Sequence, residues 1–144
     1  MALYTIGFSK KNARQFFTLL QQNGVRRLLD IRLNNKSQLA GFTKVPDIEY
    51  FLREIAGIEY VYLPEFAPTD AILSGYKDKK LSWQEYEEAY MGLLQQRVPL
   101  ARMDASLFES SCLLCSEPTA EKCHRRLAAE YIAANLDGIR IVHL

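Results

Sequence analysis

The feature that most constrains the fold of this chain is a regular alternation of short apolar runs with longer amphipathic segments. The short runs lie at residues 3–8, 25–31, 59–63, 112–115 and 139–144. Runs of this length, bounded by turn residues, are typical of buried β-strands, whereas apolar residues three and four apart are typical of helices. The alternation predicts a single-domain, three-layer α/β sandwich over residues 1–144, with a mostly parallel five-stranded sheet.

Capping signals predict where the helices begin. Asn12 and Ser82 each stand three residues before a Gln or Glu, which is the capping-box pattern. A helix is also predicted to start at Pro46, and the last one to cover residues 121–136. Residues 64–80 contain two prolines and three lysines, and we expect them to form a long loop.

The order of strands is predicted to be 3-2-1-4-5, a Rossmann-like arrangement. Right-handed crossovers place every strand-to-helix loop at the same edge of such a sheet. The loops expected there contain Gly7-Phe8-Ser9, Asp30-Ile31-Arg32 and residues 115–125. Ligands of α/β proteins bind at this carboxyl edge, so we expect the functional site among these loops.

The densest group of reactive side chains follows the fourth strand. Two thiols, two carboxylates, an imidazole and two guanidiniums lie within the thirteen residues from Leu114 to Arg126. A thiol near the start of a helix is stabilised as the thiolate by the partial positive charge there. We therefore predict a catalytic group of Cys115, Glu117, Cys123 and His124.

Two arginines are expected at the same edge. Arg32 follows the second strand and Arg125 lies near the start of the last helix. Guanidinium groups beside a helix N-terminus suit phosphate or carboxylate, and a glycine and a serine at the end of the first strand fit the same role. The sequence thus predicts anion binding by Gly7, Ser9, Arg32 and Arg125.

Each of these residues also has a structural interpretation. Arg32 can pair with Asp30 or Glu117 to hold two loops together, and Ser9 can cap the first helix. His124 can be an ordinary first-turn residue that faces solvent. The cysteines can be small buried apolar residues, and for Cys112, in the middle of a strand, this interpretation is favoured.

A zinc site is a further alternative. Cys115, Cys123 and His124 are possible ligands, with Glu117 or water as a fourth. Neighbouring residues such as Cys123 and His124 point in different directions on a helix, and a tight Cys-x-x-Cys knuckle is missing. The prediction therefore has no cofactor, with zinc as the alternative.

Several familiar classes are excluded by spacing. No cysteine is followed six residues later by arginine, as a Cys-x5-Arg phosphatase loop requires. The pair Cys112 and Cys115 lies in a strand, whereas a thioredoxin-type Cys-x-x-Cys opens a helix. Neither a Gly-x-Gly-x-x-Gly motif nor a P-loop is present.

Bulk properties limit the partners. A net charge of +1 gives no overall attraction to nucleic acid or membrane, and no apolar run approaches the roughly 18 residues of a spanning helix. Without a signal-peptide pattern, three cysteines suggest a reducing cytoplasm. Lys77, Lys79 and Lys80 are most simply a solvated loop tip, but they could contact a nucleic-acid backbone.

The motifs together resemble a known family. Thr5-Ile6-Gly7-Phe8-Ser9, Leu29-Asp30-Ile31-Arg32, Cys115-Ser116-Glu117 and Cys123-His124-Arg125 are similar to domain-of-unknown-function family 488. The resemblance implies a bacterial or archaeal α/β protein and marks the same site residues, but it implies no activity. Phe8 replaces the usual His of the family, and residues 33–37 lack its usual proline and arginine.

The first functional hypothesis is a small cytoplasmic enzyme, or a binder, of an anionic small molecule or nucleotide. Arg32 and Arg125 would hold the anion beside the thiols. The alternatives are a nucleic-acid-associated module and a zinc-stabilised structural or interaction domain. No membrane partner is expected, and the oligomeric state is left open.

Overall fold

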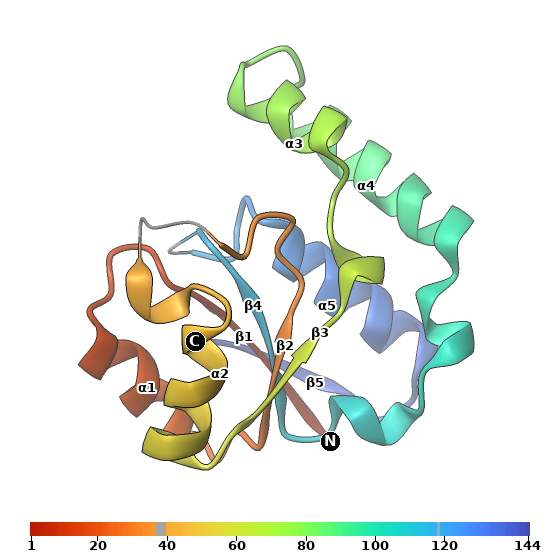
Figure 1. Cartoon of the computed structure of the whole chain (residues 1–144). Helices are drawn as coiled ribbons and strands as arrows, with labels where there is room; N and C mark the ends of the chain where they lie inside the picture. The colour runs from red at the N-terminus through yellow and green to blue at the C-terminus, as the bar shows by residue number, and fades with distance from the viewer. Residues whose placement is uncertain (37–39, 118) are drawn as a thin grey trace.

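A computed structural model describes residues 1–36, 40–117 and 119–144. One sheet of five parallel strands lies between two layers of helices (Figure 1). The strands are β1 (Ala2–Gly7), β2 (Arg27–Asp30), β3 (Glu59–Tyr62), β4 (Ser111–Cys115) and β5 (Arg140–His143). The α-helices are α1 (Ala13–Gln22), α2 (Asp47–Phe51), α3 (Asp70–Lys77), α4 (Trp83–Arg97) and α5 (His124–Asn135). The predicted three-layer α/β architecture is confirmed.

The predicted order of strands is wrong. The sheet has the order β3-β2-β4-β1-β5, so that β4 pairs with both β1 and β2, and β5 pairs with β1. Every residue of β4 is buried, which requires helices on both faces and a strand on each side. The unbroken apolar run at 112–115 fits this central position. As a consequence, the end of β4 lies between the ends of β1 and β2.

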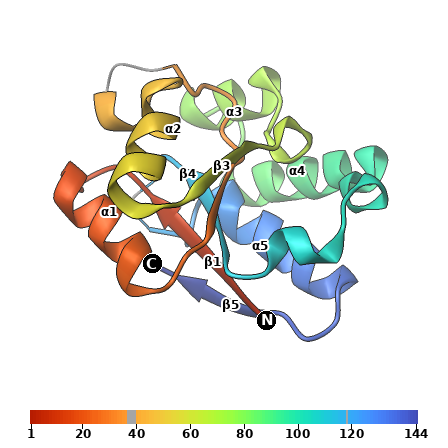
Figure 2. The ribbon, with the colours of Figure 1, turned by 60° about the horizontal axis from the view of Figure 1, so that its bottom comes forward.

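One face of the sheet is covered by α1 and α2 (Figure 2). The capping box predicted at Asn12 is present, and Phe16, Phe17 and Leu20 of α1 are buried. The helix that begins near Pro46 continues from α2 into a π-helix at Leu52–Ala56. The wider turn breaks the 3.6-residue spacing, so Ile55, which the pattern predicts to be buried, is 50% exposed.

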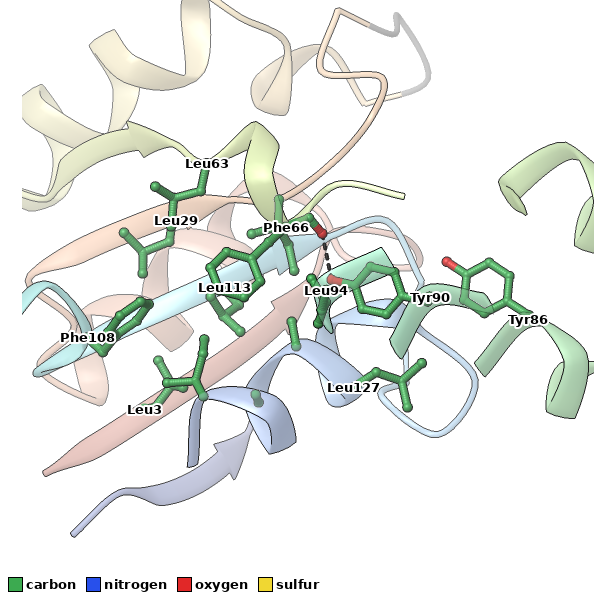
Figure 3. Close-up of a cluster of buried hydrophobic side chains, with 14 residues drawn as sticks. Leu3, Leu29, Leu63, Phe66, Tyr86, Tyr90, Leu94, Phe108, Leu113 and Leu127 are labelled. Atoms are coloured by element: carbon green, nitrogen blue, oxygen red, sulfur yellow. Dashed lines mark hydrogen bonds between the residues drawn. The ribbon is translucent and has the colours of Figure 1, made fainter. Parts of the chain in front are cut away.

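The opposite face is covered by α4 and α5. Figure 3 shows the core on this side, where Leu3, Leu29 and Leu113 of the sheet meet Phe66 and aromatic residues of α4. Tyr90 is fully buried and donates its hydroxyl hydrogen to the carbonyl oxygen of Phe66, 2.6 Å away. This bond satisfies the only polar atom of a large apolar ring.

The expected long loop at residues 64–80 is mostly helical. It contains a 3-10 helix at Pro64–Phe66 and then α3, whose N-cap is Thr69. Proline is tolerated at the first position of a helix, so the prolines do not exclude helices here. The α3–α4 hairpin extends away from the sheet (Figure 1), and Gly75 gives Leu81 the space it needs at the turn.

Two smaller features complete the fold. The segment between α4 and β4 forms a pair of 3-10 helices, Pro99–Arg102 and Ala105–Phe108. The last helix begins at His124 with Cys123 as its N-cap, three residues later than expected. In the described parts of the chain, no helix is both long and apolar enough to cross a membrane.

Candidate functional site

The central position of β4 joins three loops at the carboxyl edge of the sheet. The amide of Ser9, after β1, donates to the carbonyl of Ser116, after β4, at 2.9 Å. On the other side, the amide of Ile31, after β2, donates to the carbonyl of Leu114 at 3.3 Å. These bonds hold the three loops in a fixed arrangement, as the edge rule for parallel sheets predicts.

A cleft of about 940 Å³ opens between these loops and the α3–α4 hairpin. On the side of the sheet, its lining includes Ser9, Arg32, Glu117, Cys123 and His124. Three other predicted site residues, Gly7, Cys115 and Arg125, are fully or largely buried behind this lining. The predicted residues therefore form an outer group, which borders the cleft, and an inner group.

Arg32 is held by protein groups. Its Nε and Nη2 donate to the two carboxylate oxygens of Asp30 at 2.8 and 2.9 Å. Its Nη1 and Nη2 also donate to the side chain and the carbonyl of Thr43, and Tyr60 donates to Asp30 at 2.6 Å. The guanidinium is only 5% exposed, and its charge is neutralised. Of the two interpretations of Arg32, this geometry favours the pairing that holds loops together.

Phe8 lies at the position where the resemblance described above implies a His. Its ring is 9% exposed, lines the cleft and lies 5.6 Å from the guanidinium carbon of Arg32. The contact is a cation–π interaction. At this position the chain therefore presents an apolar surface and no titratable group. Residues 33–37 are the second place where the sequence differs from the pattern that the resemblance implies. Of these residues, Ser37 lies outside the described residues.

The thiols of Cys115 and Cys123 lie together. Cys115 ends β4, Cys123 caps α5, and their Sγ atoms are joined as a disulfide. Both residues are buried, and only Cys123 borders the cleft. Cys112 lies in the middle of β4 as a free thiol, and burial raises its pKa far above the ordinary value. It is a packing residue, as expected.

His124 does not face solvent. Its Nε2 lies 2.7 Å from the carbonyl oxygen of Ile31, and because a carbonyl only accepts hydrogen bonds, Nε2 carries the proton. The lone pair of a neutral ring is then on Nδ1, which lies 4.0 Å from the Sγ atom of Cys123. Burial lowers the pKa of His124 to about 4, so the ring is neutral at pH 7.

Arg125 is fully buried, and its surroundings differ from those of Arg32. Its Nη1 donates to the carbonyl oxygen of Glu117 at 3.2 Å, and its Nε has no hydrogen-bond partner among the described residues. No carboxylate in that part of the chain forms an ion pair with it. Burial lowers the pKa of this guanidinium, which shows how poorly its charge is solvated.

Gly7 makes room for this arrangement. A Cβ atom at this position would overlap the carbonyl oxygen of Glu117 and lie 2.5 Å from Nη1 of Arg125. Gly7 therefore supports the site through close packing. Ser9 borders the cleft, and the cap of the first helix is Asn12, so the capping alternative for Ser9 is wrong. The side chain of Glu117 is exposed at the cleft.

The hairpin adds residues that sequence reasoning missed. Its side of the cleft includes the aromatic residues Tyr76, Trp83 and Tyr86, with Trp83 and Tyr86 stacked at 5.0 Å between ring centroids. The predicted lysine group, Lys77, Lys79 and Lys80, is exposed and lies on the rim. The spacing of Trp83 and Tyr86 in a helix indicates a shared face, but only the fold reveals that this face meets the thiols.

A metal site is not formed by the described residues. Nowhere in them do three or more His, Cys, Asp or Glu side chains converge as ligands. The sulfur atoms of Cys115 and Cys123 contact each other directly, and Nε2 of His124 is engaged with a carbonyl. Zinc binding by these three residues stays a hypothesis for metal analysis.

The fold and site define an α/β protein with a thiol–imidazole group at the carboxyl edge of a parallel sheet. The chain matches the family model of the domain of unknown function DUF488 over residues 12–132, and it belongs to this family. The matched range begins after the opening motif at Thr5–Ser9. Comparison with curated proteins gave no match, and neither did comparison with solved structures.

Proposed function

We propose that this protein is an enzyme that binds a nucleotide or another phosphorylated small molecule in the cleft. The observation that carries the proposal is that one cleft combines an aromatic wall with a rim of lysines. Its volume of about 940 Å³ lies within the usual range of small-molecule sites. Its position at the carboxyl ends of the strands is where parallel α/β proteins bind ligands.

The charge of the lining favours an anion. Arg32 is neutralised by Asp30, so it is left out of the balance. The remaining lining has four lysines and two glutamates, a difference of two positive charges. The lysines are Lys77, Lys79, Lys80 and Lys122, and the glutamates are Glu85 and Glu117.

The start of α5 is the place for the anionic group. Lys122 borders the cleft there, and the uncompensated charge of Arg125 lies behind Glu117. The free amide groups of a helix N-terminus add to this positive potential. An aromatic base would pack against the wall formed by Trp83 and its neighbours.

The reacting part of the ligand would lie beside Cys123. When the bond to Cys115 is reduced, the thiol of Cys123 is the nucleophile, with Nδ1 of His124 facing it and Glu117 at the cleft as a proton acceptor. Cys115 lies directly behind Cys123. These four residues are the proposed catalytic group, and the reaction they perform is left to substrate screening.

Isothermal titration with AMP, adenosine and ribose 5-phosphate tests the proposal. AMP should bind most tightly, because it alone has both a base for the aromatic wall and a phosphate for Lys122 at the start of α5. Trp83→Leu should weaken AMP binding by about fivefold, at the low end for base stacking because Tyr86 already covers the ring. Lys122→Gln should weaken AMP and ribose 5-phosphate alike, but leave adenosine unchanged.

Arg102→Gln is the matched control for charge. Arg102 is an exposed arginine in the 3-10 helix before β4, outside the cleft lining, so its loss should leave all three affinities unchanged. Equal weakening by Lys122→Gln and Arg102→Gln would mean that only net charge matters. Absence of binding by all three compounds would refute the proposal.

A nucleic-acid-associated role is the second candidate. It is favoured by the α3–α4 hairpin, which projects from the sheet (Figure 1). Lys77 ends α3, Lys79 and Lys80 follow it, and all three line the cleft together with aromatic side chains. Single-stranded nucleic acids bind to such combinations, with an affinity that falls steeply with salt. Salt-sensitive binding of an oligonucleotide, lost when all three lysines are replaced by Gln, would favour this role over a nucleotide site.

A further inference from the structure

We propose that Cys115 and Cys123 form a reversible dithiol–disulfide pair that exchanges with small anionic disulfides and thiols entering the cleft. This activity uses the cleft of the proposed function, but it does not require that a nucleotide binds there. The chemical class of the substrate is a low-molecular-weight disulfide that carries carboxylates. The lysines of the rim favour such a molecule.

The geometry of the sulfur atoms points to this pair. Cys115 and Cys123 are separated by eight positions in sequence, and the short segment from the end of β4 to the start of α5 turns back so that their Sγ atoms meet. Cys123 borders the cleft, whereas Cys115 lies behind it with no exposed surface. An incoming disulfide therefore meets Cys123 first, and Cys115 is placed to react with Cys123.

The surroundings of Cys123 favour its role as the attacking thiol. It is the N-cap of α5, a helix of twelve residues, and the partial positive charge at a helix N-terminus favours a thiolate there. Nδ1 of His124 lies 4.0 Å from this sulfur, and the bond from Nε2 to the carbonyl of Ile31 fixes the ring. His124 accepts a hydrogen bond from the reduced thiol of Cys123 and so orients its sulfur.

The arrangement is a counterpart of the Cys-x-x-Cys motif of thioredoxin-type proteins. In that motif both cysteines belong to one helix start, whereas here the strand supplies one cysteine and the helix cap supplies the other. The local pair Cys112 and Cys115 has the motif spacing but is not joined. Side chains alternate between the two faces of a strand, so residues three positions apart point to opposite faces. Cys112 is therefore an internal control for thiol reactivity.

The exchange is balanced in two steps. The Cys123 thiolate attacks one sulfur of the disulfide RSSR, the S–S bond breaks, and one RS⁻ leaves and takes up a proton. The thiolate of Cys115 then attacks Sγ of Cys123 and releases the second RS⁻, which is also protonated. The protein loses two electrons and two protons and gains the Cys115–Cys123 bond, while RSSR is reduced to two RSH.

The test uses the whole, reduced protein and oxidised glutathione. After incubation, the protein is unfolded in denaturant that contains N-ethylmaleimide, so that every remaining free thiol is blocked, and it is then digested and analysed by mass spectrometry. We expect a disulfide between Cys115 and Cys123, two glutathione molecules released per chain and a blocked Cys112. In the absence of disulfide, Cys123 should alkylate about tenfold or more faster than Cys112.

Three variants assign the order of steps. Cys115→Ser should stop at a mixed disulfide on Cys123, with one glutathione released, and Cys123→Ser should form no adduct at Cys115 on the same timescale. Cys112→Ser should behave as the native protein. Thermal melting of each variant establishes whether it is folded. If a variant is unfolded, the result for the native protein still tests the proposal.

Two outcomes would overturn the inference. One is a native protein that forms no Cys115–Cys123 bond with oxidised glutathione. The other is protection of both thiols until a chelator is added, which would indicate a metal site. AMP titration of Cys115→Ser keeps the two proposals separate, because nucleotide binding does not depend on exchange.

Discussion

Two arginines are buried at the carboxyl edge of the sheet, and the protein holds them in opposite ways. Arg32 has a carboxylate, a hydroxyl and a carbonyl around it, whereas Arg125 has one carbonyl and an unpaired Nε within the described structure. A paired guanidinium needs no ligand, so Arg32 serves to shape the loop after β2. An unpaired buried charge is unfavourable, and an anion nearby would lower its free energy.

The difference between the two arginines indicates which part of the edge binds a ligand. The loop after β2 is completed by the chain itself, through Asp30, Thr43 and Tyr60. At the segment between β4 and α5, the positive charge of Arg125 has no carboxylate partner among the described residues, and the thiol pair lies at the two ends of this segment. An anionic ligand therefore gains the most binding free energy near the segment between β4 and α5. The predictions below test this difference between the two regions.

The largest effect is expected at the paired arginine. Asp30→Asn removes the counter-charge of Arg32 in a fully buried position, and it should lower the free energy of unfolding by about 3–5 kcal/mol. Chemical denaturation measures this change. Glu59→Gln, which breaks the exposed pair with Arg27, is the matched control and should change stability by less than about 1 kcal/mol. Similar small effects of both substitutions would mean that Arg32 is not held by its charge.

The next effect is expected at Gly7. In Gly7→Ala the new Cβ overlaps the carbonyl of Glu117, and the free energy of unfolding should fall by about 3 kcal/mol, at the high end for overpacking. Gly92→Ala, in the exposed face of α4, meets no atom within 4 Å and should raise it by about 0.5–1 kcal/mol. A stable Gly7→Ala protein would show that the loop after β4 is free to move away.

The third effect is a loss of stability at acidic pH through His124. Its pKa is about 4 in the folded protein and near 6.5 when unfolded, so the unfolded state binds the proton first. The contribution is complete above pH 6.5 and is lost as pH falls toward 4, by up to about 3 kcal/mol. Denaturation at several pH values measures the slope.

His124→Gln should remove this slope, whereas His143→Gln should keep most of it. Burial also lowers the pKa of His143, but its side chain is exposed on β5 and its effect is smaller. Identical slopes in the native protein and in His124→Gln would show that the buried imidazole does not titrate as stated.

The smallest change in stability is expected at the unpaired arginine. Arg125→Met replaces an uncompensated charge by an apolar side chain, and it should leave the free energy of unfolding unchanged or raise it by about 1 kcal/mol. The same substitution should weaken AMP binding, since the positive charge behind Glu117 no longer contributes to the potential of the cleft. Arg32→Met, which leaves Asp30 unpaired, should instead be strongly destabilising. Equal destabilisation by both substitutions would show that the protein does not hold the two arginines in different ways.

Much of the fold was predictable because it follows from local pattern. Apolar periodicity and the capping boxes at Asn12 and Ser82 depend on neighbours within one turn, and they predict α1 and α4 correctly. The helix α3 was missed because Pro68 and the lysines resemble a loop, whereas its partly buried face exists only against α4. The order of strands was missed because pairing depends on burial across the whole sheet.

The sequence by itself determined the layers, the parallel sheet and the chemistry gathered near residues 115–125, since these depend on residue type and spacing. Only the tertiary structure decided which groups meet. It placed β4 between β1 and β2, brought Thr43 and Tyr60 to the Arg32–Asp30 pair, and left Arg125 without a carboxylate among the described residues. Contacts between residues far apart in sequence are set by how whole faces pack, and no local pattern encodes them.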